Sequence, residues 1–365
     1  MSQTVRDYFL QVDDFRQATK CTYRLADILL IGLCTFLSNG QDYEDMVLFA
    51  QTQGLHLPDL IDLSRGIPAH DTFNRVFQLL DPELLKSCLD QHGKALLSLL
   101  AEKQICLDGK KLKGVSPRSR GTDGFFIVNA WVSENRLCIG QQRVENKSNE
   151  IDALVPLLKR MDITDAVVSI DAMGCQTDVV QQIITQKGHY LLALKANQES
   201  LLEEVECAFR ANRGRVADES WEYSRGRFEE RRCWILSAPA CLDGSFLVQW
   251  PGLQSVIKVE SRRTQPSGTQ TEVRYYISDE NETNPLYYSK LVRGHWGIEN
   301  HLHWHLDVTF KEDACRVRQG YGPENLATLR KLALQLLSQQ TDRLSMQKRR
   351  VKAAYDIDYL KKIII

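Results

Sequence analysis

The spacing of apolar residues divides the chain into a helical first part and a mixed second part. Apolar residues recur at helical intervals over residues 23–37 and 43–55, with a turn signal between them. A further helix is predicted from Phe73, Val76 and Phe77, with Asp71 as its N-terminal cap. Another helix begins after Asp81 and continues through Leu100. Residues 1–100 are therefore expected to form a helical unit, which either touches a partner or supports the next domain.

From residue 104 onwards, short apolar runs alternate with helical periods. Strands are predicted over residues 105–107, 125–132, 137–144, 166–170 and 190–194, and helices over residues 148–160 and 176–187. Three strands, a helix, a strand, a helix and a strand is the order of a ribonuclease-H-like fold, although flavodoxin-like and other α/β chains also alternate. We predict an α/β fold with a ribonuclease-H-like mixed sheet and helices.

The second half of the chain adds a β-rich insertion and two further helical segments. Strand patterns at residues 233–236, 254–260 and 272–277 place the insertion at about residues 214–282. In the next segment the residues with helical spacing, which predict one buried face, are Ile298, Leu302, Trp304, His305, Leu306 and Phe310. An amphipathic helix is predicted over residues 323–345, followed by a basic tail, residues 346–365. The predicted α/β domain, with its β-rich insertion, therefore spans residues 101–345.

Composition excludes several classes of protein. The net charge of −1 does not indicate a nucleic-acid binder, yet residues 101–120 hold six Lys/Arg against two acids. Such a basic run is either a solvated surface or a local phosphate contact. The ten cysteines form no Cys-x-x-Cys pair, which favours reduced thiols in a cytoplasmic protein. The N-terminus has no apolar signal region, and residues 28–37 are too short to span a membrane.

Three carboxylates are candidates for one site. Asp108 and Asp171 each follow a short apolar run, so their side chains can converge at the ends of strands. Glu299 lies among aromatic, histidine and basic residues, on the segment whose helical spacing runs from Ile298 to Phe310. Carboxylate oxygens alone suit two Mg²⁺ or Mn²⁺ ions in a phosphoryl displacement. The alternatives are strand-end turn residues and a solvated helical Glu.

Other residues compete for parts of this assignment. The rival third carboxylates are Asp307, Glu312 and Asp313. His301 and His305 are one helical turn apart, with His303 between them, which leaves a zinc site open although no His-Glu-x-x-His pattern is present.

Several segments together resemble the H-repeat-associated transposase-like family, whose members are bacterial insertion-sequence proteins with a DDE catalytic domain. These segments are LDGKKLKG (107–114), KSNEI (147–151), IDAMGCQ (170–176), LALKANQ (192–198), HDTFNRVF (70–77) and RGHWGIENHLHWHLDVTFKED (293–313). The resemblance extends over nearly the whole chain. It implies a ribonuclease-H-like fold and Mg²⁺-dependent DNA cleavage and strand transfer. It also implies a catalytic, metal-binding triad of Asp108, Asp171 and Glu299.

The resemblance also suggests which residues meet double-stranded DNA at the element ends and at the target. Phosphate contacts are expected from Lys110, Lys111, Lys113, Arg293 and His295, and contacts to the DNA end from Lys195 and Asn197. Trp296 is expected to stack on a base. Pairing two ends implies a homodimer on DNA, in the cytoplasm and associated with the nucleoid.

One departure from the pattern of related transposases concerns the residues around the glutamate. Those proteins often carry Tyr, Arg and Lys at offsets that here hold Val292, His295 and Leu306. His295, Arg293 or Lys311 would then have to serve at the phosphate. Two alternatives stay open, a catalytically silent DNA-binding relative and a nuclease without strand transfer.

Overall fold

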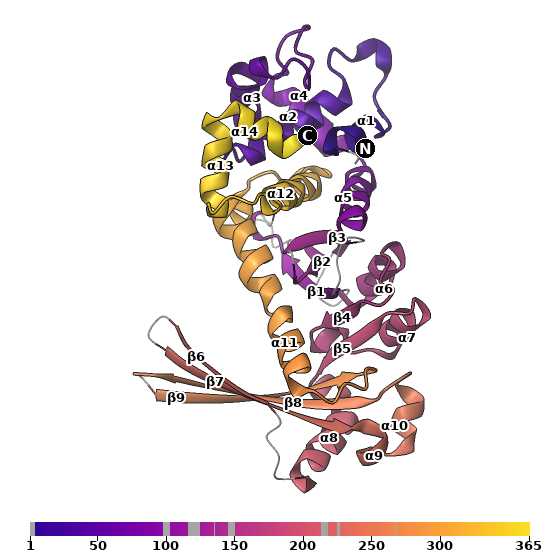
Figure 1. Ribbon diagram of the computed structural model, residues 1–365. Helices are drawn as coiled ribbons and strands as arrows, with labels where there is room; N and C mark the ends of the chain where they lie inside the picture. Colours follow the sequence, from indigo (N-terminus) through magenta and orange to yellow (C-terminus); the bar gives the residue numbers. More distant parts are fainter. Residues whose placement is uncertain are drawn as a thin grey trace.

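The computed structural model describes residues 4–97, 103–115, 125–134, 136–144, 150–212, 218–224, 227–266 and 268–365. Helices from both ends of the chain gather at one end of the molecule (Figure 1). They are α1 (Val5–Leu10), α2 (Leu25–Leu37), α3 (Tyr43–Thr52), α4 (His70–Leu79), α5 (Pro82–Leu97), α12 (Gly322–Ser338), α13 (Met346–Tyr355) and α14 (Ile357–Ile364). Among the described residues, no helix is both long enough and apolar enough to cross a bilayer.

The predicted helices of the N-terminal unit lie close to the observed ones. α4 buries Phe73, Val76 and Phe77, as its spacing predicts. The predicted cap is wrong, because the N-cap is Ala69 and Asp71 lies exposed in the first turn, where its charge still complements the helix dipole. Residues 98–100, the predicted end of the last helix of this unit, lie outside the described residues.

The described strands form one nine-stranded mixed sheet in the order β3-β2-β1-β4-β5-β9-β8-β7-β6. Its first half consists of β1 (Gln104–Lys111), β2 (Phe126–Val132), β3 (Leu137–Val144), β4 (Val167–Ile170) and β5 (His189–Leu194). β1, β4 and β5 are parallel, whereas β2 and β3 are antiparallel to their neighbours. The mixed α/β fold predicted from the sequence is therefore present.

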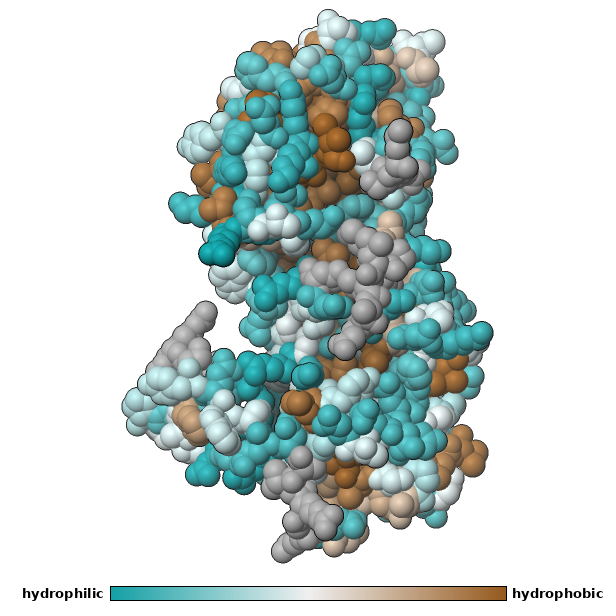
Figure 2. Space-filling view, viewed as in Figure 1, coloured by the Kyte–Doolittle hydropathy of each residue, from teal (hydrophilic) through white to brown (hydrophobic). Residues whose placement is uncertain are grey.

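The β-rich insertion extends this same sheet. It contains β6 (Asp218–Ser224), β7 (Arg227–Ser237), β8 (Ser255–Gln265) and β9 (Gly268–Ser278), with the short helices α9 (Ala238–Cys241) and α10 (Gly244–Gln249). β9 pairs antiparallel with β5 and so joins the insertion to the central strands. The far ends of these strands project as an arm (Figure 1), and the surface is hollowed between the arm and the helical end (Figure 2).

Helices cover both faces of the central strands. α6 (Glu150–Arg160), α7 (Thr177–Thr185) and α8 (Glu199–Ala211) cover one face, where Leu107, Val128 and Leu157 share a core. The other face carries α5, α12 and the long segment that begins with α11 (Pro285–His295). Residues of β1 alternate between these faces, so Asp108 and Lys110 point away from the core that holds Leu107.

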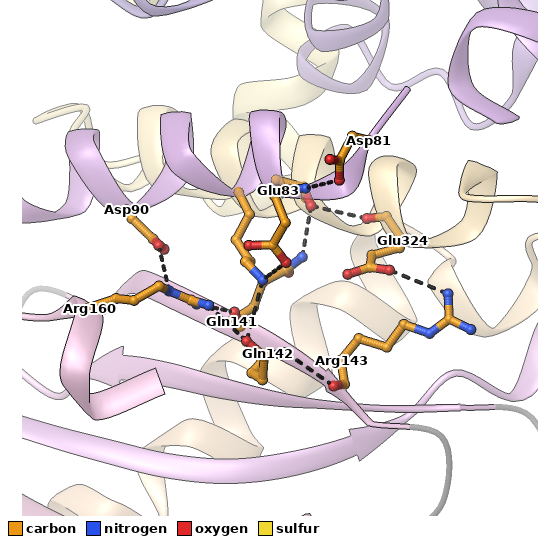
Figure 3. A network of polar contacts seen from close by, with 10 residues as sticks. Asp81, Glu83, Asp90, Gln141, Gln142, Arg143, Arg160 and Glu324 are labelled. Atoms are coloured by element: carbon orange, nitrogen blue, oxygen red, sulfur yellow. Dashed lines mark hydrogen bonds and ion pairs between the residues drawn. The ribbon is translucent and has the colours of Figure 1, made fainter. Parts of the chain in front are cut away.

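A polar network joins the helical unit to the sheet (Figure 3). Arg160, at the end of α6, lies 3.2 Å from Asp90 of α5 and donates to the Gln141 carbonyl at 2.7 Å. Arg143 of β3 lies 3.4 Å from Glu324 of α12. These contacts fix the helical end against the β3 edge.

The C-terminal segment differs from its predicted form. α12 is predicted to be amphipathic, but it is enclosed on all sides, including Arg330 and Lys331, because it passes between the N-terminal helices and β3. The predicted basic tail is folded as α13 and α14. Arg350 is fully buried there and donates to the Phe36 carbonyl at 2.8 Å, so this arginine holds helices together.

Candidate functional site

Two of the three candidate carboxylates, Asp108 and Asp171, are brought together by the parallel pairing of β1 with β4. Leu107 of β1 lies opposite Ile170 of β4, so the next residues, Asp108 and Asp171, lie side by side. Asp171 directly follows the end of β4, but the predicted strand end at Asp108 is wrong, because β1 continues to Lys111 in its pairing with β2. Asp171 begins a short 3₁₀ turn and accepts a hydrogen bond from the Met173 amide at 3.2 Å. Parallel pairing of two short apolar strands is thus sufficient to bring these two residues together.

Glu299 lies on a π-helical continuation of α11. After His295 the chain forms the π-helical segments Ile298–His303 and His305–Thr309, and the Phe310 amide donates to the His305 carbonyl at 2.9 Å. A π-helix closes i to i+5 hydrogen bonds and so turns through a smaller angle per residue than an α-helix.

The wider turn determines which side chains are buried. Ile298, Leu302, Leu306 and Phe310, each four residues from the next, are buried, whereas Trp304 is 50% exposed. The prediction that Trp304 belongs to the buried face is therefore wrong, because Trp304 is two residues from both Leu302 and Leu306 and so points to the opposite side of the helix.

The three carboxylates line one pocket of about 530 Å³. Asp171 and Glu299 are exposed, whereas Asp108 is half-buried in the wall. Burial, together with the negative charges of Asp171 and Glu299, raises the pKa of Asp108 to about 7. The pocket therefore concentrates negative charge that a bound cation would neutralise.

The three candidate carboxylates suit a hard divalent cation. All three candidate ligands offer only carboxylate oxygens, which Mg²⁺ and Mn²⁺ prefer. Over the described ranges, no three His, Cys, Asp or Glu side chains form a closed group around a point where a metal could sit. Asp108, Asp171 and Glu299 line the same pocket without forming such a group, so an ion there would need water or substrate oxygens among its ligands.

The lysines after Asp108 are placed differently from one another. Lys110 is 8% exposed, and its ammonium lies 2.7 Å from Asp307, 2.9 Å from Glu312 and 3.6 Å from Asp313. The three rival carboxylates of the sequence analysis are therefore those that hold this buried lysine. Lys111 is half-buried over the Phe126 ring, and Lys113 is exposed and paired with Asp313 at 2.9 Å.

The remaining predicted DNA contacts surround the pocket. Lys195 is exposed and lines it, and Asn197 donates to the Ala172 carbonyl at 2.6 Å, which supports the loop that carries Asp171. Trp296 also lines the pocket. Arg293 forms an ion pair with Glu222 of the insertion.

His295 lines the pocket as a neutral side chain. Its Nδ1 lies 3.0 Å from the Ser169 hydroxyl, and burial lowers its pKa to about 4. At neutral pH this histidine does not bring positive charge to a phosphate.

The three histidines of the zinc alternative point to different partners. His301 stacks on Trp131, with ring centroids 6.2 Å apart, and the Nδ1 atom of His305 lies 3.0 Å from the Thr309 hydroxyl. The Nδ1 atom of His303 lies 3.6 Å from a carboxylate oxygen of Asp108. Among the described residues, these imidazoles have different partners and form no group that could hold a metal.

Two acidic or basic residues near the pocket were not among the sequence candidates. The Glu150 carboxylate lies where a Cβ on Gly109 would be, at 2.6 Å, and its charge contributes to the raised pKa of Asp108. Its presence in KSNEI was the available signal; residues 147–149 of that motif lie outside the described residues. Arg274 of β9 lines the pocket from the insertion, and no short motif marked it.

Comparisons with known proteins agree with the motifs. The family model described as "Transposase DDE domain" matches residues 100–336, and the model described as "DDE_Tnp_1-associated" matches residues 6–92. The chain is 32% identical over 362 residues to "H repeat-associated putative transposase YhhI" of Escherichia coli (strain K12), covering 97% of this chain and 95% of that protein. It is 31% identical to "Putative transposase YncI" of Escherichia coli O157:H7, covering 99% of this chain and 94% of that protein.

Two more distant or partial matches were found. A segment of 63 residues, 17% of this chain, is 41% identical to 75% of "Inactive transposase YbfQ" of Escherichia coli (strain K12). A solved structure of the piggyBac transposase synaptic complex with hairpin DNA aligns with a TM-score of 0.44 at 12% identity, covering 98% of this chain and 78% of that one, and no argument rests on it. The extent and identity of the full-length matches show that this chain belongs to the transposase DDE domain family, together with the H-repeat-associated transposases.

Proposed function

We propose that this transposase cuts and joins DNA at the ends of its insertion sequence, in a metal-dependent reaction centred on Asp108, Asp171 and Glu299. The observation that carries the proposal is the pocket lined by all three carboxylates. Burial, together with the charges of Asp171 and Glu299, raises the pKa of Asp108 there, which agrees with a site that a cation would neutralise. The order and direction of β1 to β5 support a ribonuclease-H-like description of the catalytic domain.

The three carboxylates would hold two Mg²⁺ or Mn²⁺ ions, which supply electrostatic stabilisation to an in-line phosphoryl displacement. Asp108, Asp171 and Glu299 all line the pocket and would be the protein ligands of these ions. The Asn197 side chain would keep the Asp171 loop in place. His295 would line the pocket as a neutral side chain, so it would not add positive charge for the anionic substrate.

The DNA contacts that the geometry supports best are those on the exposed rim of the pocket. Lys195 and Trp296 line the pocket itself, and Lys113 is exposed beside the end of β1. We leave Lys110 out of this set, because three carboxylates already hold its buried ammonium. The hollow between the arm and the helical end (Figure 2) would accommodate a duplex, and pairing of two ends would require a second copy of the chain.

The proposal is tested by changing Asp171→Asn and measuring Mg²⁺-dependent cleavage of a duplex that carries the flanking ends of the element. A lost metal ligand should reduce cleavage at least about a hundredfold without unfolding the exposed strand end. Asp178→Asn is the matched control, since Asp178 is an exposed aspartate on the neighbouring helix α7. Equal cleavage by the wild type and the Asp171→Asn variant would refute the assignment.

A silent relative is the second candidate, favoured by the matched segment of a protein named as an inactive transposase. Calorimetric titration with Mn²⁺ distinguishes the two, because a silent scaffold should show no heat that depends on Asp171. A nuclease without joining activity would cut the same duplex but give no joined product from precleaved ends.

A further inference from the structure

One wall of the carboxylate pocket is built by the insertion. β9 contributes its residues 272–276 to the lining, opposite the segment that carries Trp296 and Glu299. The pairing of β5 with β9 explains this position, because Leu194 lies opposite Tyr275. The next residues outward on the two strands, Lys195 and Arg274, therefore lie at the same edge of the pocket.

This edge supplies the positive charge that the sequence pattern lacked. The arginine expected before the glutamate is His295 here, which is neutral, and Lys110 is held by carboxylates. Among the described residues that line the pocket, the lysines and arginines are Lys195 and Arg274. Lys195 offers a single exposed ammonium, whereas the planar guanidinium of Arg274 can donate hydrogen bonds to two phosphate oxygens at once.

The guanidinium of Arg274 is held over the ring of Trp296. Its central carbon lies 4.2 Å from the ring centroid, and Trp296 precedes Glu299 by three residues. Such cation–π stacking orients the guanidinium and leaves its edge free for hydrogen bonds. In the free protein this edge meets Glu272, with nitrogen–oxygen distances of 2.8 and 2.7 Å.

We propose that Arg274 is the phosphate-binding arginine of the site and that Glu272 occupies it until DNA arrives. This inference rests on the proposed function. A carboxylate offers acceptor oxygens much like those of a phosphate, so the incoming backbone replaces Glu272 while Trp296 keeps the guanidinium oriented. The Arg274 and Glu272 side chains are 30% and 46% exposed, which leaves the pair accessible for this exchange. The Trp296 face that Arg274 covers is then a support for the arginine, and a base would have to use the other face.

The exchange predicts opposite effects for the two residues of the pair. Arg274→Gln should weaken binding of an element-end duplex about tenfold, as expected for a lost charge-assisted contact. The slope of log K against log salt concentration should become shallower by about one, because one phosphate contact is lost. Glu272→Gln should strengthen binding, since the carboxylate that pairs with the guanidinium is then removed.

The arm contains a matched control pair. Arg232 of β7 lies 2.6 Å from Glu230 in the same i, i+2 arrangement. The preceding residue, Arg231, lines a groove together with Val292 and Arg293 of α11. Because side chains alternate along a strand, Arg232 points to the other face of the sheet. Arg232→Gln and Glu230→Gln should leave both the affinity and the salt slope unchanged. Arg274→Lys should give intermediate binding, because it keeps the charge and loses the planar stack.

The decisive experiment measures equilibrium binding of the full-length protein to that duplex over a series of KCl concentrations, with Mn²⁺ affinity by calorimetry in parallel. The inference is supported if Arg274→Gln lowers the slope and leaves the Mn²⁺ affinity unchanged. It is overturned if Arg274→Gln matches Arg232→Gln while the wild type still cleaves in an Asp171-dependent way. A wild type that neither binds nor cleaves the duplex would instead count against the proposed function. Tighter binding by Glu272→Gln cannot arise from misfolding, so the pair remains informative if Arg274→Gln is unstable.

Discussion

Replacing Lys110 by Met tests whether this lysine is a structural clamp or a DNA ligand. Its ammonium joins β1 to Asp307, Glu312 and Asp313, which follow the segment that carries Glu299. The clamp thus links the strand of Asp108 to the segment of Glu299. Methionine keeps most of the apolar stem and removes only the charge.

The cost of this change follows mainly from Glu312. That carboxylate is 2% exposed, whereas Asp307 and Asp313 reach solvent. Removing one partner of a buried ion pair costs about 3–5 kcal/mol, and here Glu312 would stay buried with only the longer-range charges of Lys331 and Arg330 acting on it. We expect a loss of that size in the free energy of unfolding, measured by urea titration with an unchanged m-value. Lys110→Met combined with Glu312→Gln should recover much of it, since the buried charge is then absent.

The pH dependence provides an independent check. Burial raises the pKa of Glu312, but Lys110 and Lys331 outweigh it, so the pKa lies below its ordinary value. A carboxyl with a lowered pKa stabilises the fold above its unfolded pKa, and this contribution is lost as the pH falls through the folded value. The stability difference between wild type and Lys110→Met should therefore shrink at acidic pH. A variant that loses less than ~1 kcal/mol, yet binds DNA with a shallower salt dependence, would show that Lys110 is a phosphate ligand.

Two further predictions concern the contact between the helical unit and the sheet, and the helical segment that carries Glu299. Burial raises the pKa of Asp90 from 3.8 to about 6 despite Arg160, so its ionisation should lower stability as the pH rises from 4 to 7. Asp90→Asn should remove that slope in thermal unfolding, and the difference is worth at most ~3 kcal/mol at pH 7. A Cβ at Gly297 would lie 2.6 Å from the buried Trp131 ring, so Gly297→Ala should cost about 1–3 kcal/mol and displace Glu299, which would reduce cleavage. Gly244→Ala, which has no atom within 4 Å, should change neither stability nor cleavage.

Local patterns were sufficient to predict where the central strands lie and that Asp108 and Asp171 are close together. Short apolar runs located β1, β4 and β5, and parallel pairing of neighbours placed Asp108 beside Asp171, although β1 extends past Asp108 to Lys111. In the insertion, β7, β8 and β9 were predicted too short and β6 was not predicted, because many of their residues are exposed or half-buried. β9, for example, is exposed from Gly268 through Glu272 and buried only near Tyr276. A strand half of which faces water carries little apolar signal, and its hydrogen bonds depend on neighbours that the sequence does not identify.

Charged residues were the least predictable, since the same side chain serves at the surface or in the core. Lys110 and Lys113 occur three residues apart in one basic run, yet one is buried among carboxylates about 200 residues away and the other is exposed. Arg350 likewise lay in a segment predicted as a tail and became a fully buried donor to backbone carbonyls. A basic run in the sequence shows only that positive charge is concentrated there. Which partner each charge meets depends on tertiary packing.

Arg274 illustrates how the insertion contributes to the carboxylate pocket. Arg274 reaches Trp296 only because β9 adds to the sheet beside β5 in a register that pairs Tyr275 with Leu194. A slip of one residue would turn Arg274 to the opposite face, since side chains alternate along a strand. The same register places Glu272 two residues away on the same face, where it meets the guanidinium. The pairing of β9 with β5 therefore sets the charge balance at this edge of the pocket, and it brings Arg274 to aspartates that precede it in the chain by about a hundred residues or more.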